Sequence, residues 1–183
     1  MKKMLYVVPC IVLLAAMAWG QGSKKTVSQV LDSAVKGPEG EFVSAADAMP
    51  EDKYSFAPTN GEFKGVRTFA QQVKHVAAVN YMVGAAMLGE KPPVELGSEN
   101  GPDSLKSKAE IMTFLKDSFA YAHKAAASVD EKNMTDPIKS PFGEGQTTRL
   151  SMAMLIPAHA FDHYGQMVEY LRMNGIVPPA SRQ

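Results

Sequence analysis

Apolar residues recur every three or four positions over four long stretches of the chain, which is the spacing of amphipathic α-helices. The stretches cover residues 27–46, 66–88, about 105–129 and about 147–174. The segments between them show no convincing alternation of the kind that a strand would give. The pattern therefore predicts an all-α fold, an antiparallel four-helix bundle with long crossover loops.

Capping and turn-forming residues refine these helices. Pro38, with a glycine on either side at positions 37 and 40, predicts a kink or a break in the first helix. Ser107 and Glu110 have the spacing of a capping box at the start of the third. Gly175 is placed to end the fourth. Three aromatic residues, Tyr54, Phe56 and Phe63, lie in the turn-rich loop 50–65, and we expect them to cover one end of the core.

The first twenty residues have the pattern of a secretion signal. Lys2 and Lys3 precede an apolar run over residues 4–18, and small residues follow it. This run is shorter than the roughly 20 apolar residues that a membrane-spanning helix needs. We therefore expect a cleavable signal peptide at 1–20, a bundle domain at 21–183 and export to the periplasm or the medium. No membrane contact is expected after cleavage, and retention as an uncleaved anchor is the alternative.

The charge and the cysteine content of the chain argue against several classes of function. Removing Lys2 and Lys3 leaves 17 basic residues against 19 acidic ones. A slightly negative protein is a poor match for nucleic acid, so no nucleic-acid partner is expected. The single cysteine, Cys10, lies inside the predicted signal peptide. The processed chain would therefore have neither a cysteine nucleophile nor a zinc–thiolate site.

The histidines are the strongest sign of chemistry. His159 and His163 are four residues apart in the fourth predicted helix, so both project from one face with Cβ atoms ~6 Å apart. His75 lies on the apolar face of the second helix and can face this pair across the bundle. Three imidazoles leave coordination positions open on a divalent metal, with zinc or nickel preferred and iron or manganese as alternatives. The competing interpretation is that the histidines only pack in the core.

Other polar residues near this site have less certain roles. Asp162 adjoins His163 in sequence but points about 100° away around the helix, as a carboxylate beside the site or on the surface. Gln166 can hydrogen-bond a ligand residue or form a helix contact. His123 is either a fourth ligand or an exposed histidine, and Glu144 precedes the fourth helix near the expected mouth of the site.

Two segments carry a family resemblance. The sequence HAFDHYGQ at 159–166, followed by YLRMNG at 170–175, resembles the C-terminal helix of the DinB-like (DinB/YfiT) superfamily. Residues 69–80, which include His75, are similar to its second-helix ligand segment. The resemblance extends over residues 27–180, nearly the whole processed chain.

This resemblance implies an antiparallel four-helix bundle that holds a divalent metal with one histidine from the second helix and two from the fourth. His75, His159 and His163 fill those positions. Members include thiol-dependent transferases and isomerases that act with mycothiol or bacillithiol. Tyr164 departs from the family pattern, because a basic residue often stands there. That departure and the predicted export both argue against a cytosolic thiol as the substrate.

Three functions follow as hypotheses. The first is an exported metal-dependent hydrolase or thiol-dependent transferase, in which the metal activates a bound water or thiol as a Lewis acid. An unidentified small molecule would then occupy the open metal position. The alternatives are a non-catalytic metal- or ligand-binding module of the cell envelope and a purely structural bundle, and a homodimer is left open. Histidine ligands of ordinary pKa would lose metal affinity as the pH falls through about 6.5.

Overall fold

The computed structural model describes residues 24–182, so the predicted signal peptide lies outside the described residues. Four helices form the fold: α1 (Val27–Ala48), α2 (Phe69–Leu88), α3 (Lys108–Ala127) and α4 (Arg149–Met173). Two short strands, β1 (Pro137–Lys139) and β2 (Gln146–Thr148), and two single 3₁₀ turns, Glu51–Lys53 and Pro179–Ser181, complete the elements. The predicted all-α four-helix class is confirmed. Within 24–182, no helix has both the length and the hydrophobicity needed to cross a bilayer.

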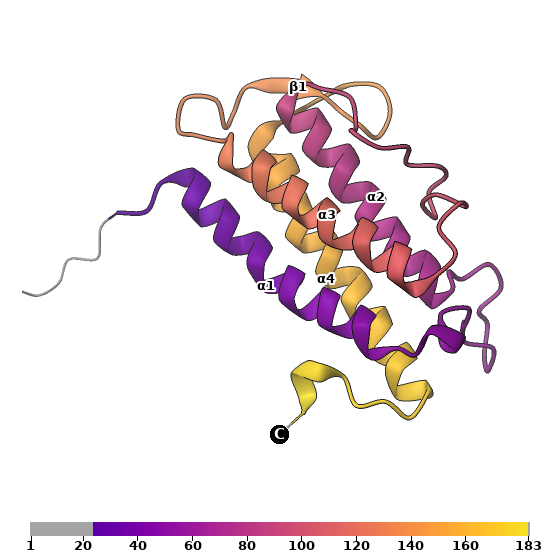
Figure 1. Cartoon of the computed structure of the whole chain (residues 1–183). Helices are drawn as coiled ribbons and strands as arrows, with labels where there is room; N and C mark the ends of the chain where they lie inside the picture. Colours follow the sequence, from indigo (N-terminus) through magenta and orange to yellow (C-terminus); the bar gives the residue numbers. More distant parts are fainter. Residues whose placement is uncertain (1–23, 183) are drawn as a thin grey trace, which may run out of the picture.

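The helices pack as a square in which α1 and α2 each contact α3 and α4. In Figure 1, α1 and α4 run in one direction and α2 and α3 in the other. The ion pair between Lys124 near the end of α3 and Glu90 just after α2 reflects this, since those two helices end side by side. The crossover at 89–107 returns along the bundle, so α2 and α3 are parallel neighbours. The antiparallel contacts are α1 with α3 and α2 with α4.

Side-chain caps set the helix boundaries. Thr68 accepts a hydrogen bond from the Gln71 backbone, and the Gln71 side chain accepts one from the Thr68 backbone. This capping box starts α2 at Phe69, three residues later than the apolar pattern predicted. The predicted box between Ser107 and Glu110 is present at the start of α3. Each box pairs backbone N–H groups that would otherwise lack a partner in the first helical turn.

The structure corrects two expectations about regular elements. α1 continues through Pro38, which is buried, so the predicted break is absent. The connection at 130–145, expected to lack strands, contains β1 and pairs it antiparallel with β2. Each strand has only three residues, too few for a recognisable alternation. The hairpin lies across the end of α2 (Figure 1) and leads into Thr148, whose hydroxyl caps α4.

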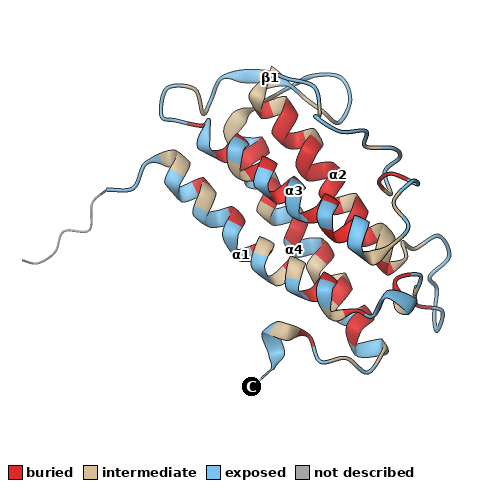
Figure 2. Ribbon diagram, viewed as in Figure 1, coloured by how far each residue is buried: buried red, intermediate tan, exposed pale blue. Residues whose placement is uncertain are grey.

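The core lies between the four helices, whose buried residues face one another (Figure 2). Phe42, Phe69 and Phe119 are fully buried there. The loop 50–65 contributes Tyr54, which is buried and donates a hydrogen bond to the Ala46 carbonyl. Phe56 is half-buried against Tyr170, whereas Phe63 is exposed. Two of the three loop aromatics therefore cover the core as expected.

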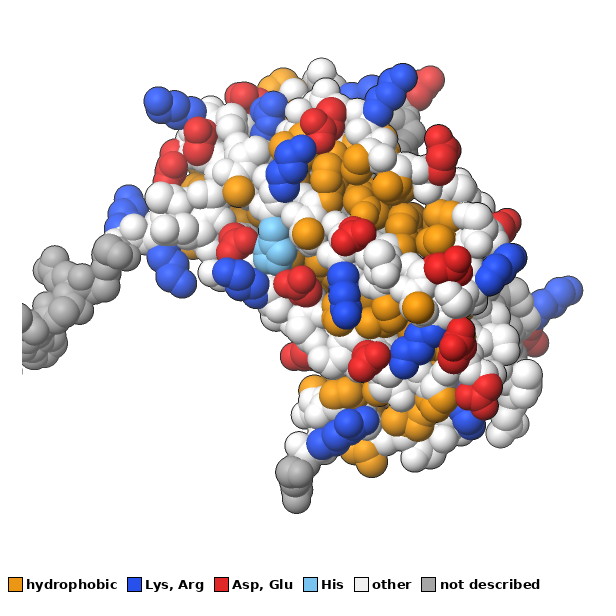
Figure 3. Space-filling model, in the orientation of Figure 1, with side chains coloured by type: hydrophobic (Ala, Val, Ile, Leu, Met, Phe, Trp, Pro, Cys, Tyr) orange, Lys and Arg blue, Asp and Glu red, His pale blue; other side chains and the backbone are white. Residues whose placement is uncertain are grey.

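Charged side chains of both signs are interspersed on the face that Figure 3 shows, with apolar side chains between them. His123, on α3, joins that helix to α1. Its Nδ1 lies 2.6 Å from a carboxylate oxygen of Asp32, and its Nε2 lies 3.0 Å from one of Glu39. Both ring nitrogens are engaged, so His123 is neither a fourth ligand nor a free exposed histidine.

The loop 97–102 is pressed against the first half of α2. Gly101 has a φ of 75°, and a Cβ atom there would lie 2.5 Å from the Cβ of Lys74. The Lys74 ammonium is buried and donates to the Pro102 carbonyl at 2.8 Å, and Arg67 donates to the Asn100 side chain at 2.9 Å. Burial lowers the pKa of Lys74. These contacts fix the backbone of the loop beside the turn of α2 that carries His75.

We expect Gly101→Ala to destabilise the protein by more than about 3 kcal/mol, because the methyl group adds a clash with Lys74 to the strain of a left-handed backbone. Gly175→Ala is the matched control, since its φ of 73° is nearly the same and no atom lies within 4 Å of the added methyl. The control should cost about 1 kcal/mol. Urea unfolding measures both, and equal losses would show that the close approach to Lys74 contributes nothing.

Candidate metal centre

Three histidines meet in the contact between α2 and α4. One nitrogen from each of His75, His159 and His163 lies within 4.8 Å of the other two. The three ring centroids are 4.5 to 5.0 Å apart. His159 and His163 are one turn apart on α4, and the antiparallel packing of α2 brings His75 to the same level. The structure therefore places together the three residues that the sequence predicts as ligands.

A backbone carbonyl orients His75. Its Nδ1 hydrogen-bonds the carbonyl oxygen of Glu99, which belongs to the loop held against α2. A carbonyl oxygen only accepts, so Nδ1 carries the proton and Nε2 keeps its lone pair. That Nε2 lies 3.2 Å from Nε2 of His159. The loop contact thus presents the unprotonated Nε2 of His75 to the cluster.

A chain of side chains orients His163 in the same way. Its Nδ1 lies 2.6 Å from Oε1 of Gln72, which is 1% exposed. The Gln72 amide nitrogen donates to Oε1 of Gln166 at 2.8 Å, so the Gln72 oxygen must face His163. Gln166 in turn donates to Asp162 at 3.4 Å. Nδ1 of His163 is therefore a donor, and its Nε2 is free to bind an ion.

His159 is held differently. Its Nδ1 is buried and has no hydrogen-bond partner among the described residues. Packing within α4 and against the other two rings sets the position of this imidazole. No hydrogen bond from Nδ1 selects its tautomer, in contrast to His75 and His163.

Burial keeps the three imidazoles neutral. Desolvation lowers the pKa of His159 to about 3, and repulsion from protonated His163 and His75 adds to the shift. Desolvation also lowers the pKa of His163 to about 4, with repulsion from His75 next in importance. The pKa of His75 is lowered as well, again mainly by burial. All three are in the neutral form that binds metals at pH 7.

The donor set fits a divalent ion. Two imidazole nitrogens that each lie ~2.05 Å from one tetrahedral ion are about 3.3 Å apart. The 3.2 Å between Nε2 of His75 and Nε2 of His159 is close to this value. Neutral rings at this separation, two of the three with an acceptor fixed at Nδ1, are the arrangement that metal-binding histidines use.

The remaining polar residues lie outside the cluster. Within residues 24–182, no carboxylate joins the three histidines. Asp162 is exposed and contacts Gln166, which connects it to Gln72 rather than to an imidazole. Glu144 lines a cavity between α2 and the hairpin. Gln166 itself has the helix-contact role, through Gln72.

Cavities open along α2 next to the cluster. One of about 410 Å³ is lined by His75, Val79 and Met82 on α2 and by Leu96 and Phe142 on the facing loops. It lies within the size range of small-molecule sites. His75 is the cluster residue that a small molecule in this cavity would meet.

Two positioning groups were not predicted from the sequence. Gln72 lies three residues before His75 on the same apolar stripe, and a polar residue within such a stripe was a signal that could have found it. The carbonyl of Glu99 has no comparable signal, because it is a backbone group whose position depends on how the loop packs.

Solved structures of similar shape support the fold. A DinB-like protein from Bacillus cereus is 14% identical with a TM-score of 0.64, covering 82% of this chain and 95% of its own. A conserved protein from Enterococcus faecalis is 16% identical with a TM-score of 0.65, at 82% and 98% coverage. A DinB-like protein from Bacillus subtilis is 15% identical with a TM-score of 0.62, at 84% and 99% coverage. No curated protein matches the sequence.

The family model of the DinB superfamily matches residues 39–167. That range is well over half of the chain, and it contains α2, most of α4 and all three histidines of the cluster. The chain belongs to the DinB superfamily.

Proposed function

We propose that this protein binds one divalent metal ion through His75, His159 and His163. One observation carries the proposal: three neutral imidazoles converge, and two of them donate from Nδ1 to fixed acceptors, the Glu99 carbonyl and the Gln72 side chain. Such acceptors hold the ring and its tautomer in place before an ion arrives. A set of histidines that only packed in the core would not need fixed acceptors at two of its three Nδ1 atoms.

Zinc and nickel suit the proposed site best. Neutral imidazole is a ligand that both ions favour, and iron and manganese are the alternatives. The cluster offers three nitrogens and no carboxylate or thiolate among the described residues. Three protein ligands leave room for another molecule, which is typical of catalytic rather than structural sites.

We propose a metal-dependent enzyme, either a hydrolase or a thiol-dependent transferase. A divalent ion at this position supplies Lewis-acid activation of a water or a thiol. The cavity beside His75 gives a small substrate access to the cluster. Gln72 and the Glu99 carbonyl keep the rings in place while the surrounding helices exclude bulk water. The cavity thus provides a place for the substrate to bind, and the two acceptors orient the rings as such a reaction requires.

The second candidate is a non-catalytic metal- or ligand-binding module. The absence of a carboxylate from the cluster, among residues 24–182, favours it, because hydrolysis usually draws on a general base. Export to the periplasm or the medium is part of both proposals and rests on the basic start and apolar run of residues 1–20.

Purified without a histidine tag, the protein should bind one equivalent of zinc or nickel, measured by elemental analysis and titration calorimetry. A thousandfold excess of metal over the Kd should raise the Tm by about 10 °C. His163→Ala removes one ligand and should weaken binding more than about hundredfold and abolish this rise. Unchanged stoichiometric binding by His163→Ala would refute the proposed ligand set.

Two further variants control for general damage. His123→Gln changes a histidine that contacts α1 rather than the cluster, so metal affinity should not change. Gln72→Leu removes the acceptor for Nδ1 of His163 and should weaken binding about 10- to 100-fold. Gln72→Glu keeps an acceptor oxygen at that position and should bind metal nearly as well as the wild type.

A screen of the metal-loaded protein against ester, amide and thiol-transfer substrates tests for catalysis. Turnover in the wild type should fall by at least about hundredfold in His75→Ala, which removes both a ligand and a wall of the cavity. Tight metal binding without turnover on any substrate class would favour the non-catalytic module.

Because the pKa values of the cluster histidines are lowered, we expect metal affinity to fall at a lower pH than the value of about 6.5 predicted from the sequence. Protons compete with metal only near the folded-state pKa values, about 3 for His159 and about 4 for His163. Metal affinity should therefore show no midpoint at pH 6.5, and protonation of His159 and His163 alone should lower it about twofold by pH 4 and more than about tenfold by pH 3. Calorimetry in matched buffers measures it, and a midpoint at pH 6.5 would show that the imidazoles are not buried as described.

The metal-free protein should begin to lose stability at a higher pH, below about 6.5. In the unfolded chain these histidines have ordinary pKa values near 6.5, so the unfolded state binds more protons than the folded one below that pH. The free energy of unfolding should then decrease as the pH falls from 6.5 toward 4.

A further inference from the structure

The contact between Nε2 of His75 and Nε2 of His159 requires one proton. The two atoms are 3.2 Å apart, and two unprotonated nitrogens at that distance would repel each other. His75 cannot be the donor, because the single proton of its neutral ring is on Nδ1, which donates to the Glu99 carbonyl. His159 is therefore the donor, from Nε2.

The other two imidazoles carry their proton on the opposite nitrogen. A backbone carbonyl accepts from Nδ1 of His75, and the Gln72 oxygen accepts from Nδ1 of His163. The orientation of the Gln72 amide is fixed, since its nitrogen donates to Gln166. His159 is thus the one ring of the three whose proton lies on Nε2, inside the cluster.

The proton on Nε2 of His159 lies between two of the proposed ligand atoms. The 3.2 Å between Nε2 of His159 and Nε2 of His75 suits a shared proton or a shared ion, but the two cannot be held together. An imidazole binds a metal only through an unprotonated nitrogen. For Nε2 of His159 to bind a metal, the proton of this ring must be on Nδ1.

Nδ1 of His159 is a poor place for a proton. The atom is buried and has no hydrogen-bond partner among residues 24–182. Moving the proton there breaks the hydrogen bond to His75 and leaves a buried N–H group without an acceptor, which is unfavourable. The tautomer that binds metal is therefore the disfavoured one at His159, whereas it is the favoured one at His75 and His163.

We propose that His159 is a tautomer switch in the metal centre, whose proton moves from Nε2 to Nδ1 when the centre takes up a metal ion. The Nε2 proton passes to water and Nδ1 takes one from water, so the ring stays neutral and no proton is released overall. His75 and His163 need no such change, which makes His159 the most weakly bound ligand. The switch on metal uptake rests on the proposed function, whereas the tautomers of the metal-free protein do not.

Nitrogen-15 NMR of the imidazoles tests the proposal. In the metal-free protein at about pH 7, we expect the proton on Nδ1 in His75 and His163 and on Nε2 in His159. One equivalent of zinc should move it to Nδ1 in His159 alone. The ring of His123, which contacts α1 rather than the cluster, is the internal control, and its signals should not change. A proton on Nδ1 of His159 before zinc is added would overturn the proposal.

Removing the acceptor tests the hydrogen bond itself. In metal-free His75→Ala, the Nε2 proton of His159 loses its partner, so its exchange with solvent should be at least about tenfold faster than in the wild type. His123→Gln should leave this exchange rate unchanged. An unchanged rate in His75→Ala would show that the proton is not shared with His75, which would overturn the proposal.

Matched substitutions rank the three ligands. His75→Ala, His159→Ala and His163→Ala each remove one imidazole, and competition with a chelator measures the zinc affinity of each variant. The loss of affinity in His159→Ala should be smaller than either of the other losses by at least about tenfold, because binding through His159 already costs a hydrogen bond. Equal losses in the three variants would overturn the proposal.

The zinc-loaded and metal-free spectra separate this proposal from the proposed function. Zinc binding by a protein whose His159 has its proton on Nδ1 throughout would overturn the switch and leave the metal site standing. The expected tautomers in a wild type that takes up no zinc would overturn the proposed function, and the switch on uptake with it, while the hydrogen bond between His159 and His75 would stand.

Discussion

The antiparallel contact between α2 and α4 is the interaction on which the rest of the structure depends. It sets His75 at the level of His159 and His163, and it buries Gln72 where its amide can connect His163 to Gln166. The crossover 89–107 serves the same contact from outside, because its loop lies against α2 and offers a carbonyl to His75. A change in the register of these two helices would separate His75 from the other two rings and His163 from its acceptor Gln72.

Crowding three basic rings in one buried place has an electrostatic cost that proteins usually avoid. Here each ring remains neutral, because desolvation disfavours the imidazolium form of all three and repulsion from the neighbouring rings adds to this at His159 and His163. The folded chain therefore keeps a concentrated set of lone pairs that water cannot reach freely. This is a property of the packed bundle, since the same residues in an unfolded chain would be ordinary histidines.

The sequence predicted the parts of the molecule that depend on local pattern. The four helices, the capping box at Ser107 and the shared face of His159 and His163 follow from spacing alone. What it missed depends on distant contacts. The continuity of α1 through Pro38 results from packing, the parallel α2 and α3 result from where the crossover lies, and the three-residue strands are too short to show a period. The role of the Glu99 carbonyl depends on the close approach of Gly101 to Lys74.

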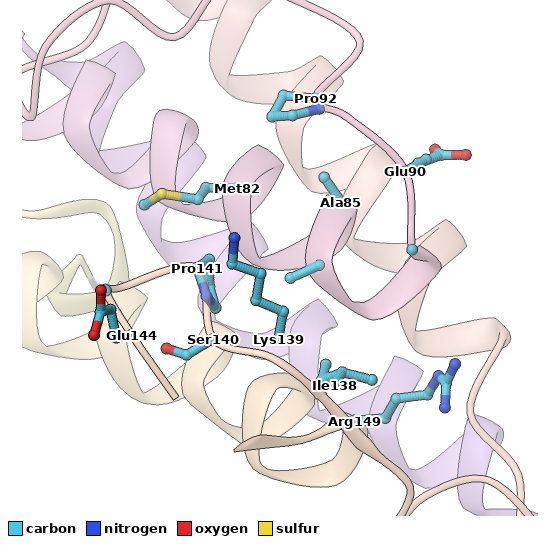
Figure 4. A pocket seen from close by; sticks show the side chains of 13 residues that line it. Met82, Ala85, Glu90, Pro92, Ile138, Lys139, Ser140, Pro141, Glu144 and Arg149 are labelled. Atoms are coloured by element: carbon cyan, nitrogen blue, oxygen red, sulfur yellow. The ribbon is translucent and has the colours of Figure 1, made fainter. Parts of the chain in front are cut away.

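The β1–β2 hairpin contributes to two tasks that do not constrain each other. Its last residue, Thr148, caps α4 and so helps to place the helix that carries two of the histidines. Its turn, 140–144, lines the cavities along α2 (Figure 4) and contributes little to the core between the helices. Substitutions in the turn can therefore change the shape of these cavities at little cost in folding free energy. In evolutionary terms, the walls of these cavities can diverge while the scaffold of the bundle stays the same.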